Sequence, residues 1–383
     1  MRHFIIAFLS FSLLACASPK PQQGAQYLLN DQLFAPTQTP IDAENIFALN
    51  DEMRLYLEAL LNKKNQNKSA QLTLFEALRN QAYLRIEYDS AMTKKAVQTF
   101  ESRSGNCLSL VIMTAALAKQ LKLTVQYQNV DVEQAWSSNG DLHFSAGHVN
   151  IILGKKDNIW REGYDASASL LIDFLPPDEL RGQKAKQIHE NTIVAMYMNN
   201  RAAELLANKQ IDDAYWFARE AILRDPEFLS AYNTMGVIYL RHHNLPQAEQ
   251  NFRAVLLRDQ KNTMAMHNLA ATLGLQERQP EAALWQAQLK KLQPSPPFYY
   301  LNLGKLAMDQ GDYQKAKALF LKELERDPYY HELHFWLGLA HFHLGELKLA
   351  TEQLISARDN STSSDSYQLY RAKLDRINSS VRP

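Results

Sequence analysis

The stretch YNTMGVIYLRHHNLPQAEQNF (residues 232–252) indicates the fold of the C-terminal half of the chain, because its pattern of small residues recurs along the sequence. Gly236 and Ala248 belong to two series of small residues, each with a step of 34 residues. The series are Ala202, Gly236, Ala270, Gly304 and Gly338, and Ala214, Ala248, Ala282, Ala316 and Ala350. Small residues let two helices approach closely, so this period predicts helix pairs stacked side by side.

This spacing resembles the tetratricopeptide repeat (TPR), with a proline after the second helix at Pro226 and Pro328. Five copies cover residues 195–364, and 365–383 form a capping helix and a tail. The resemblance implies an all-α solenoid whose concave face binds a protein or peptide ligand. The repeat pattern predicts that four aromatic residues belong mostly to the core rather than to a ligand site: Tyr232, Tyr239, Tyr300 and Trp336.

The first residues are typical of an export signal. Basic residues precede the apolar run FIIAFLSFSLLA (4–15), which is too short to span a membrane. The run ends in Leu-Leu-Ala-Cys, which resembles the lipobox of a bacterial lipoprotein. The resemblance implies a signal peptide over 1–15, lipidation of Cys16 and a tether over 16–24. Because Ala17 rather than Asp follows Cys16, it further implies a lipid anchor in the outer membrane, facing the periplasm.

Composition excludes several classes of function. The chain has 41 basic and 41 acidic residues, whereas a nucleic-acid-binding surface needs a basic excess. Phosphate-loop, dinucleotide-binding and HExxH motifs do not occur in the sequence, so we expect no cofactor and no metal site. With Cys16 used by the anchor, Cys107 is the only thiol left, and it has no disulfide partner within the chain.

Cys107 lies at the start of a predicted helix in SRSGNCLSL (102–110). From there to Ala118 the sequence is almost wholly apolar, which predicts a helix buried on all sides. Gly105 permits a tight turn, and Asn106 is a candidate N-cap. Free amides at a helix N-terminus stabilise a thiolate and could bind an oxyanion.

Helices are also predicted upstream over 43–61 and 70–80, and strands follow the Cys107 helix. The expected strands cover 123–132, 147–154, 159–162 and 169–177. His148 begins the second of these strands. Asp173 lies within the last one, where a carboxylate needs a partner because it is surrounded by apolar residues.

A helix-start cysteine, a strand led by histidine and a strand bearing aspartate resemble the transglutaminase-like branch of the papain-type thiol enzymes. The resemblance implies an α+β domain over 25–190, with Cys107 as nucleophile, His148 as its proton acceptor and Asp173 as the residue that orients the imidazole. Two alternatives stay open. His143 could replace His148, and Asp165 could replace Asp173.

We therefore expect a membrane-anchored cysteine enzyme of acyl transfer, acting as a protease, an amidase or deamidase, or a cross-linking enzyme. Its repeats would recruit a protein or peptide substrate. The alternative is a catalytically degenerate scaffold lipoprotein whose repeats mediate protein–protein interaction. Neither the substrate, the choice between hydrolysis and transfer, nor the oligomeric state follows from the sequence.

Overall fold

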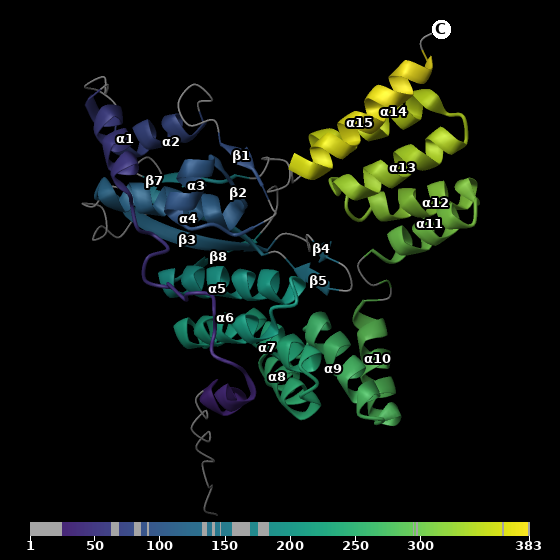
Figure 1. Cartoon of the computed structure of the whole chain (residues 1–383), viewed down its shortest axis with the longest axis horizontal. Helices are drawn as coiled ribbons and strands as arrows, with labels where there is room; N and C mark the ends of the chain where they lie inside the picture. The colour runs from purple at the N-terminus through teal and green to yellow at the C-terminus, as the bar shows by residue number, and fades with distance from the viewer. Residues whose placement is uncertain are drawn as a thin grey trace, which may run out of the picture.

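A mixed α/β part is followed by a long array of helices (Figure 1). The computed structural model describes residues 25–62, 69–79, 86–89, 92–131, 136–139, 142–145, 147–154, 169–174, 184–293, 295, 298–361 and 364–381. The predicted signal peptide, Cys16 and the tether lie outside these residues. Within them, no helix combines the length and the hydropathy needed to cross a bilayer.

A four-stranded antiparallel sheet forms the centre of the α/β part. Its strand order is β7 (Ser169–Ile172), β6 (His148–Gly154), β3 (Thr124–Asp131) and β8 (Lys184–Ile188). At one end of the sheet, His148 pairs with Val130 of β3. Strand β8 was not predicted from the sequence, because its lysine-containing sequence KAKQI lacks the expected alternation. Lysine is common on strands that, like β8, lie at the edge of a sheet.

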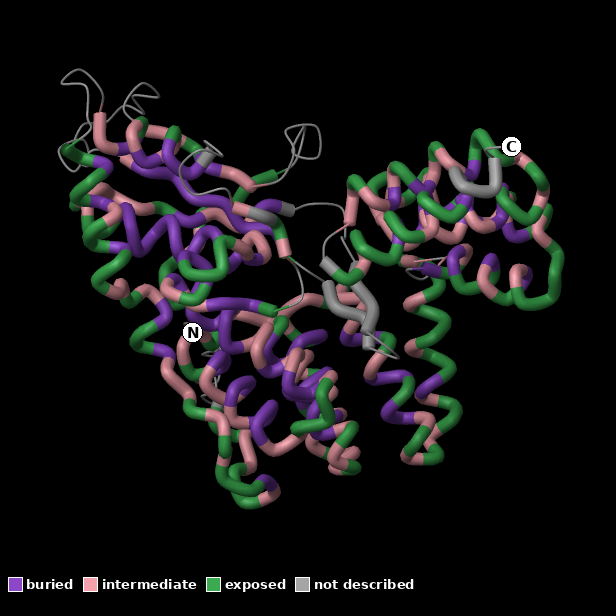
Figure 2. The backbone as a smooth tube through the Cα atoms, turned by 45° about the horizontal axis from the view of Figure 1, so that its top comes forward, coloured by how far each residue is buried: buried purple, intermediate pink, exposed green. Residues whose placement is uncertain are grey.

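Helix α4 (Cys107–Gln120) packs on β3 and β6, and it also contacts α3 (Ala96–Ser102) and α5 (Glu190–Ala207). Every residue from Leu108 to Ala118 is buried. The prediction of a helix buried on all sides is therefore confirmed. Figure 2 shows how buried and exposed residues are distributed along the backbone.

The upstream helix is shorter than predicted. It was expected over 43–61, but α1 spans Asp51–Asn62, because the side chain of Asn50 accepts a hydrogen bond from the amide of Met53 at 2.9 Å and caps the helix there. The remaining elements of this part are α2 (Ala70–Arg79), a parallel pair of β1 (Glu87–Tyr88) and β2 (Ser104–Gly105), and a hairpin of β4 (Trp136–Asn139) and β5 (Leu142–Ser145).

Of the other two predicted strands, one cannot be compared with the structure and one is shorter than predicted. The strand expected over 159–162 lies outside the described residues. The strand expected over 169–177 ends at Ile172, so Asp173 follows the strand directly instead of lying inside it. The strands expected over 123–132 and 147–154 are confirmed as β3 and β6.

Ten helices form the five predicted pairs, and α15 (Ser364–Val381) packs on the last pair. After α5 they are α6 (Ile211–Arg224), α7 (Leu229–Arg241), α8 (Leu245–Arg258), α9 (Thr263–Leu275), α10 (Gln279–Leu292), α11 (Tyr299–Asp309), α12 (Tyr313–Leu324), α13 (His331–His343) and α14 (Leu347–Asp359).

Close helix approach explains the small residues of the repeat. A Cβ atom added to Gly236 would lie 2.5 Å from Cε1 of Phe252 on the partner helix. Tyr232 and Tyr239 are buried as expected, but Tyr300 and Trp336 are only half-buried, which corrects the expectation for those two aromatics.

The array is divided after its third pair. Buried apolar residues of α5 to α10 belong to one core that continues into the α/β part, whereas those of α11 to α13 form a separate core. The sequence between these two groups is QPSPP (293–297), and prolines restrict the backbone and lack an amide donor. Figure 1 shows the two groups of helices as separate stacks.

The segment 25–39, which precedes the α/β elements, lies on the first two helix pairs and starts with the short helices η1 (Ala25–Leu28) and η2 (Asp31–Leu33). Phe34 stacks on Tyr215 of α6 with ring centroids 3.9 Å apart. The buried carboxylate of Asp213 accepts hydrogen bonds from Thr37, Gln38 and Thr39. The predicted solenoid is thus partly covered by the chain's own N-terminal segment.

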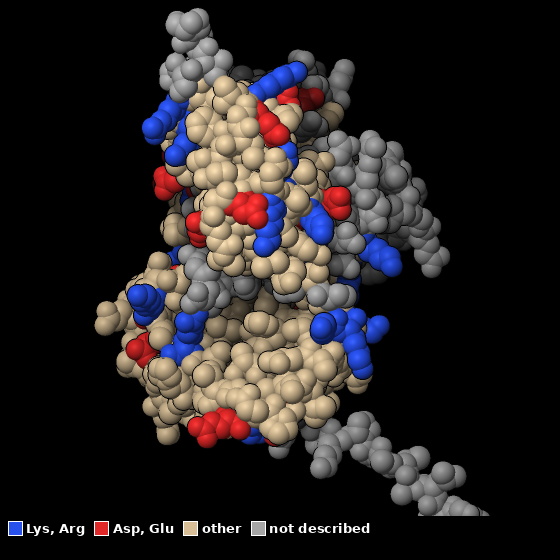
Figure 3. All heavy atoms as spheres, turned by 90° about the vertical axis from the view of Figure 1, so that its right-hand side faces the viewer, with Lys and Arg blue, Asp and Glu red and all other residues tan. Residues whose placement is uncertain are grey.

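Charged side chains are scattered over the face shown in Figure 3, with both signs interspersed among a larger uncharged surface. This distribution agrees with the balanced composition of 41 basic and 41 acidic residues.

Candidate active site

The first turn of α4 presents Cys107. Asn106 is the N-cap, as predicted, and its side-chain oxygen accepts a hydrogen bond from the amide of Ser109 at 2.9 Å. Cys107 is a free thiol and half-buried, so its sulfur is not sealed inside the core. A helix N-terminus with partial access to solvent is the environment in which cysteine is most reactive.

Gly105 is needed for close packing in front of this helix. A Cβ atom there would lie 2.7 Å from Cβ of Ser109. The sequence analysis assigned Gly105 to a tight turn, whereas the structure places it in β2, where the chain passes directly over the first turn of α4.

His148 is buried at the start of β6, and its Nε2 lies 2.7 Å from Oδ1 of Asp173. The imidazole also interacts with the side chain of Cys107, and this interaction raises the pKa of His148. The structure therefore brings together the three predicted residues Cys107, His148 and Asp173, with the imidazole between the thiol and the carboxylate.

The pKa of His148 reflects opposing influences. Burial is the largest single influence, and it lowers the pKa because it disfavours the charged imidazolium. Hydrogen bonds to Asp173 and Cys107, together with the charges of these groups, favour the imidazolium and outweigh burial. The result is a pKa raised from 6.5 to about 9.

Asn150 supports the carboxylate. It follows His148 by two residues on β6, so both side chains lie on the same face of the strand. Its Nδ2 donates a hydrogen bond to Oδ2 of Asp173 at 2.9 Å, which leaves Oδ1 of Asp173 for the imidazole. The sequence analysis did not select Asn150, although its spacing of two from a candidate histidine could have identified it.

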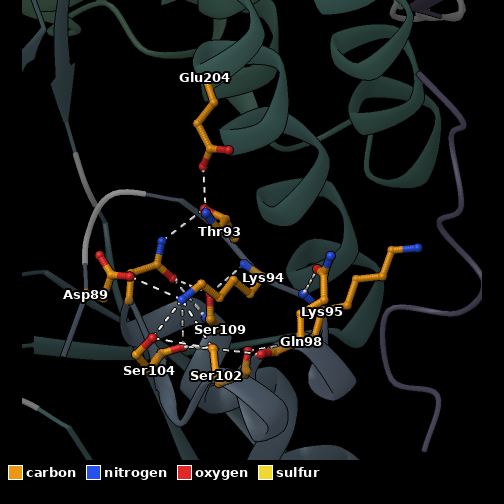
Figure 4. Close-up of polar contacts among 11 residues, drawn as sticks. Asp89, Thr93, Lys94, Lys95, Gln98, Ser102, Ser104, Ser109 and Glu204 are labelled. Carbon is orange, nitrogen blue, oxygen red and sulfur yellow. Dashed lines mark hydrogen bonds and ion pairs between the residues drawn. The ribbon is translucent and has the colours of Figure 1, made fainter. Parts of the chain in front are cut away.

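A buried cluster holds the loop in front of α4. Lys94 is buried, and its ammonium group contacts Asp89, Ser102 and Ser104. The neighbouring Thr93 is also buried, and its hydroxyl accepts a hydrogen bond from Asn106 at 2.9 Å. Figure 4 shows these contacts converging on the segment 92–95. No motif or periodicity indicated this cluster in the sequence.

The alternatives to His148 and Asp173 fall on side chains outside the described residues. The backbone of His143 lies in β5, but its side chain is outside the described residues. Asp165 and the proposed lipidation residue Cys16 also lie outside them. Within the described part of the chain, no group of three histidine, cysteine or acidic residues has the geometry to bind a metal ion.

Comparison with known proteins addresses the helical array. The family model described as "Tetratricopeptide repeat" matches residues 301–363. The C-terminal part of this chain carries tetratricopeptide repeats. Over 160 residues the chain is 28% identical to the TPR repeat-containing protein PA4667 of Pseudomonas aeruginosa, a match that covers 41% of this chain. The chain spans only 27% of the length of that relative.

Solved structures also match. The match to PilF of Pseudomonas aeruginosa has 17% sequence identity and a TM-score of 0.28. It covers 49% of this chain and 94% of the PilF chain. The match to a thermophilic TPR protein of Thermus thermophilus has 16% sequence identity and a TM-score of 0.29. It covers 48% of this chain and 98% of the Thermus chain.

Proposed function

We propose that the protein is a transglutaminase-like cysteine enzyme of acyl transfer, tethered to a membrane through Cys16, whose TPR repeats recruit a protein or peptide substrate. The observation that carries the proposal is the contact of one buried imidazole with both Cys107 and Asp173. A cysteine that packs only as a small apolar residue needs neither partner.

The proposed reaction proceeds through a thioester. The Cys107 thiolate attacks the carbonyl carbon of an amide, and the carbonyl oxygen takes up the negative charge. His148, as imidazolium, then donates its proton to the leaving nitrogen, and the carbon–nitrogen bond breaks. A water molecule or an amine next attacks the thioester while the imidazole accepts its proton, and the Cys107 thiolate leaves.

The chain supplies groups that act in the steps of this reaction. Asp173 accepts a hydrogen bond from Nε2 and so fixes the orientation of the ring. At the start of α4, the Ser109 amide is used by the cap and the Leu110 amide by the carbonyl of Asn106. The amides of Cys107 and Leu108 precede these two and are the candidates to stabilise the oxyanion.

A test uses a generic acyl donor, because the natural substrate is unidentified. Protein that begins after Cys16 is mixed with p-nitrophenyl acetate, and p-nitrophenol release is followed together with intact mass. We expect a burst of about one equivalent with acetylation of Cys107. His148→Ala should lose the burst while retaining its fold. A wild-type protein that is not acetylated at Cys107 would contradict the proposal and favour a scaffold role for the repeats.

A further inference from the structure

The segment 92–95 joins two parts of the molecule that the sequence analysis treated as separate. On one side it contacts the N-cap of the Cys107 helix, and on the other it contacts α5, the first helix of the repeats (Figure 4). These contacts are made mainly by Thr93, which is buried and lies outside any helix or strand.

The Thr93 side chain and backbone contact both parts. The hydroxyl accepts hydrogen bonds from Nδ2 of Asn106 at 2.9 Å and from Nδ2 of Asn200 at 3.2 Å, which occupies both of its acceptor sites. The backbone amide of Thr93 donates a hydrogen bond to the carboxylate of Glu204 at 2.7 Å.

The contacts to Asn106 determine how the cap is oriented. Its Nδ2 points to Thr93, and its Oδ1 therefore faces the amide and hydroxyl of Ser109, at 2.9 and 2.8 Å. The next residue, Lys94, donates its amide to the same hydroxyl of Ser109 at 2.8 Å. Thr93 thus contacts Asn106, and Lys94 contacts Ser109, so the segment 92–95 holds both partners of the cap hydrogen bond. Asn106 directly precedes Cys107.

We propose that Thr93 is a positioning residue for Cys107, held in place by Asn200 and Glu204 of the first repeat. The repeats then do more than recruit a substrate, because α5 helps to set the position of the nucleophile relative to His148. This inference rests on the proposed function, since it assumes that Cys107 reacts.

The test measures alkylation of Cys107 by iodoacetamide from pH 5 to 9 in protein that begins after Cys16. Thr93→Val removes the hydroxyl at nearly constant volume, Thr93→Ser keeps it, and Asn200→Ala removes only the donor from α5. Thr192→Val is the matched control, because Thr192 is also buried and hydrogen-bonded, but to Asp225 at 2.6 Å. Thermal unfolding by circular dichroism is recorded for every variant.

We expect Thr93→Val to slow alkylation roughly tenfold near neutral pH and to change the shape of its pH profile, since a misplacement of about 1 Å can cost about 100-fold in rate. Asn200→Ala should slow it less. Thr93→Ser and Thr192→Val should react like the wild type, whatever their thermal stability.

Three results would overturn the inference. A reactive wild type with an unchanged profile in Thr93→Val and Asn200→Ala would reject the positioning role while leaving the proposed function standing. Equal slowing by Thr192→Val would show that loss of stability alone explains the effect. An unreactive wild-type thiol would reject the proposed function, and the positioning role with it. If Thr93→Val does not fold, Asn200→Ala decides the question.

Discussion

The titration of His148 is the most specific electrostatic prediction of the structure. Its pKa is raised from 6.5 to about 9, which corresponds to about 3 kcal/mol in favour of the imidazolium. Burial alone would act in the opposite direction, so the whole increase depends on Asp173 and Cys107. Asp173→Asn removes the charge at 2.7 Å and should lower the pKa of His148, because burial is then opposed only by Cys107.

The assay is NMR of the histidine ring Cε1–H signals between pH 5 and 10, with His148→Gln to assign the signal. His331 serves as an internal control, because burial lowers its pKa and it lies elsewhere, against Tyr370 of α15. Asp173→Asn should leave the His331 titration unchanged. A His148 signal that titrates near pH 6.5 in both the wild type and Asp173→Asn would refute the electrostatic reasoning.

The raised pKa of His148 also makes the stability of the fold depend on pH. Since the folded pKa lies above the unfolded value, the charged imidazole stabilises the fold fully below pH 6.5, and the contribution is lost as the pH rises through about 9. The comparison is made in a Cys107→Ser background, where no thiol exchanges protons with the ring. There, Asp173→Asn should lower the free energy of unfolding in urea by about 2 kcal/mol at pH 6 and by less at alkaline pH, where the imidazole is neutral.

Other predictions concern the packing of the repeats. Phe34→Ala should lower the free energy of urea unfolding by about 3 kcal/mol, because a buried ring stacked on Tyr215 is lost; an unchanged value would mean that the segment 25–39 does not pack on the repeats. Gly236→Leu should weaken amide-exchange protection in α7 and also in α4, since both helices share one core and the new side chain would clash with Phe252. Gly274→Ala is the control, because a Cβ there meets no atom within 4 Å, and it should be neutral or stabilising. Protection lost only in α7 would contradict a shared core.

Regular features were predictable from the sequence because each leaves a repeated pattern. The step of 34 residues marked the helix pairs, and the apolar run after Cys107 marked a buried helix. The cap at Asn106 followed from local chemistry. The predicted start of α1 was wrong. The chain before Asp51 is apolar enough to suggest a longer helix, but the side chain of Asn50 caps the N-terminus, so the helix begins at Asp51.

The features that could not be predicted depend on contacts between distant parts of the chain. Asn150 reaches Asp173 across 23 residues, and Thr93 reaches Glu204 across 111. Phe34 meets Tyr215 because the segment 25–39 folds back over the repeats. Such pairings leave no periodic trace, so a single sequence could not reveal them.

The most direct test of the account is the rate of Cys107 alkylation against pH in the wild type and in His148→Ala, using protein that begins after Cys16. The account predicts that Cys107 is alkylated rapidly at neutral and mildly acidic pH in the wild type and much more slowly in His148→Ala. A thiol that is unreactive, or that reacts with the same pH dependence in both proteins, would contradict a Cys107–His148 pair.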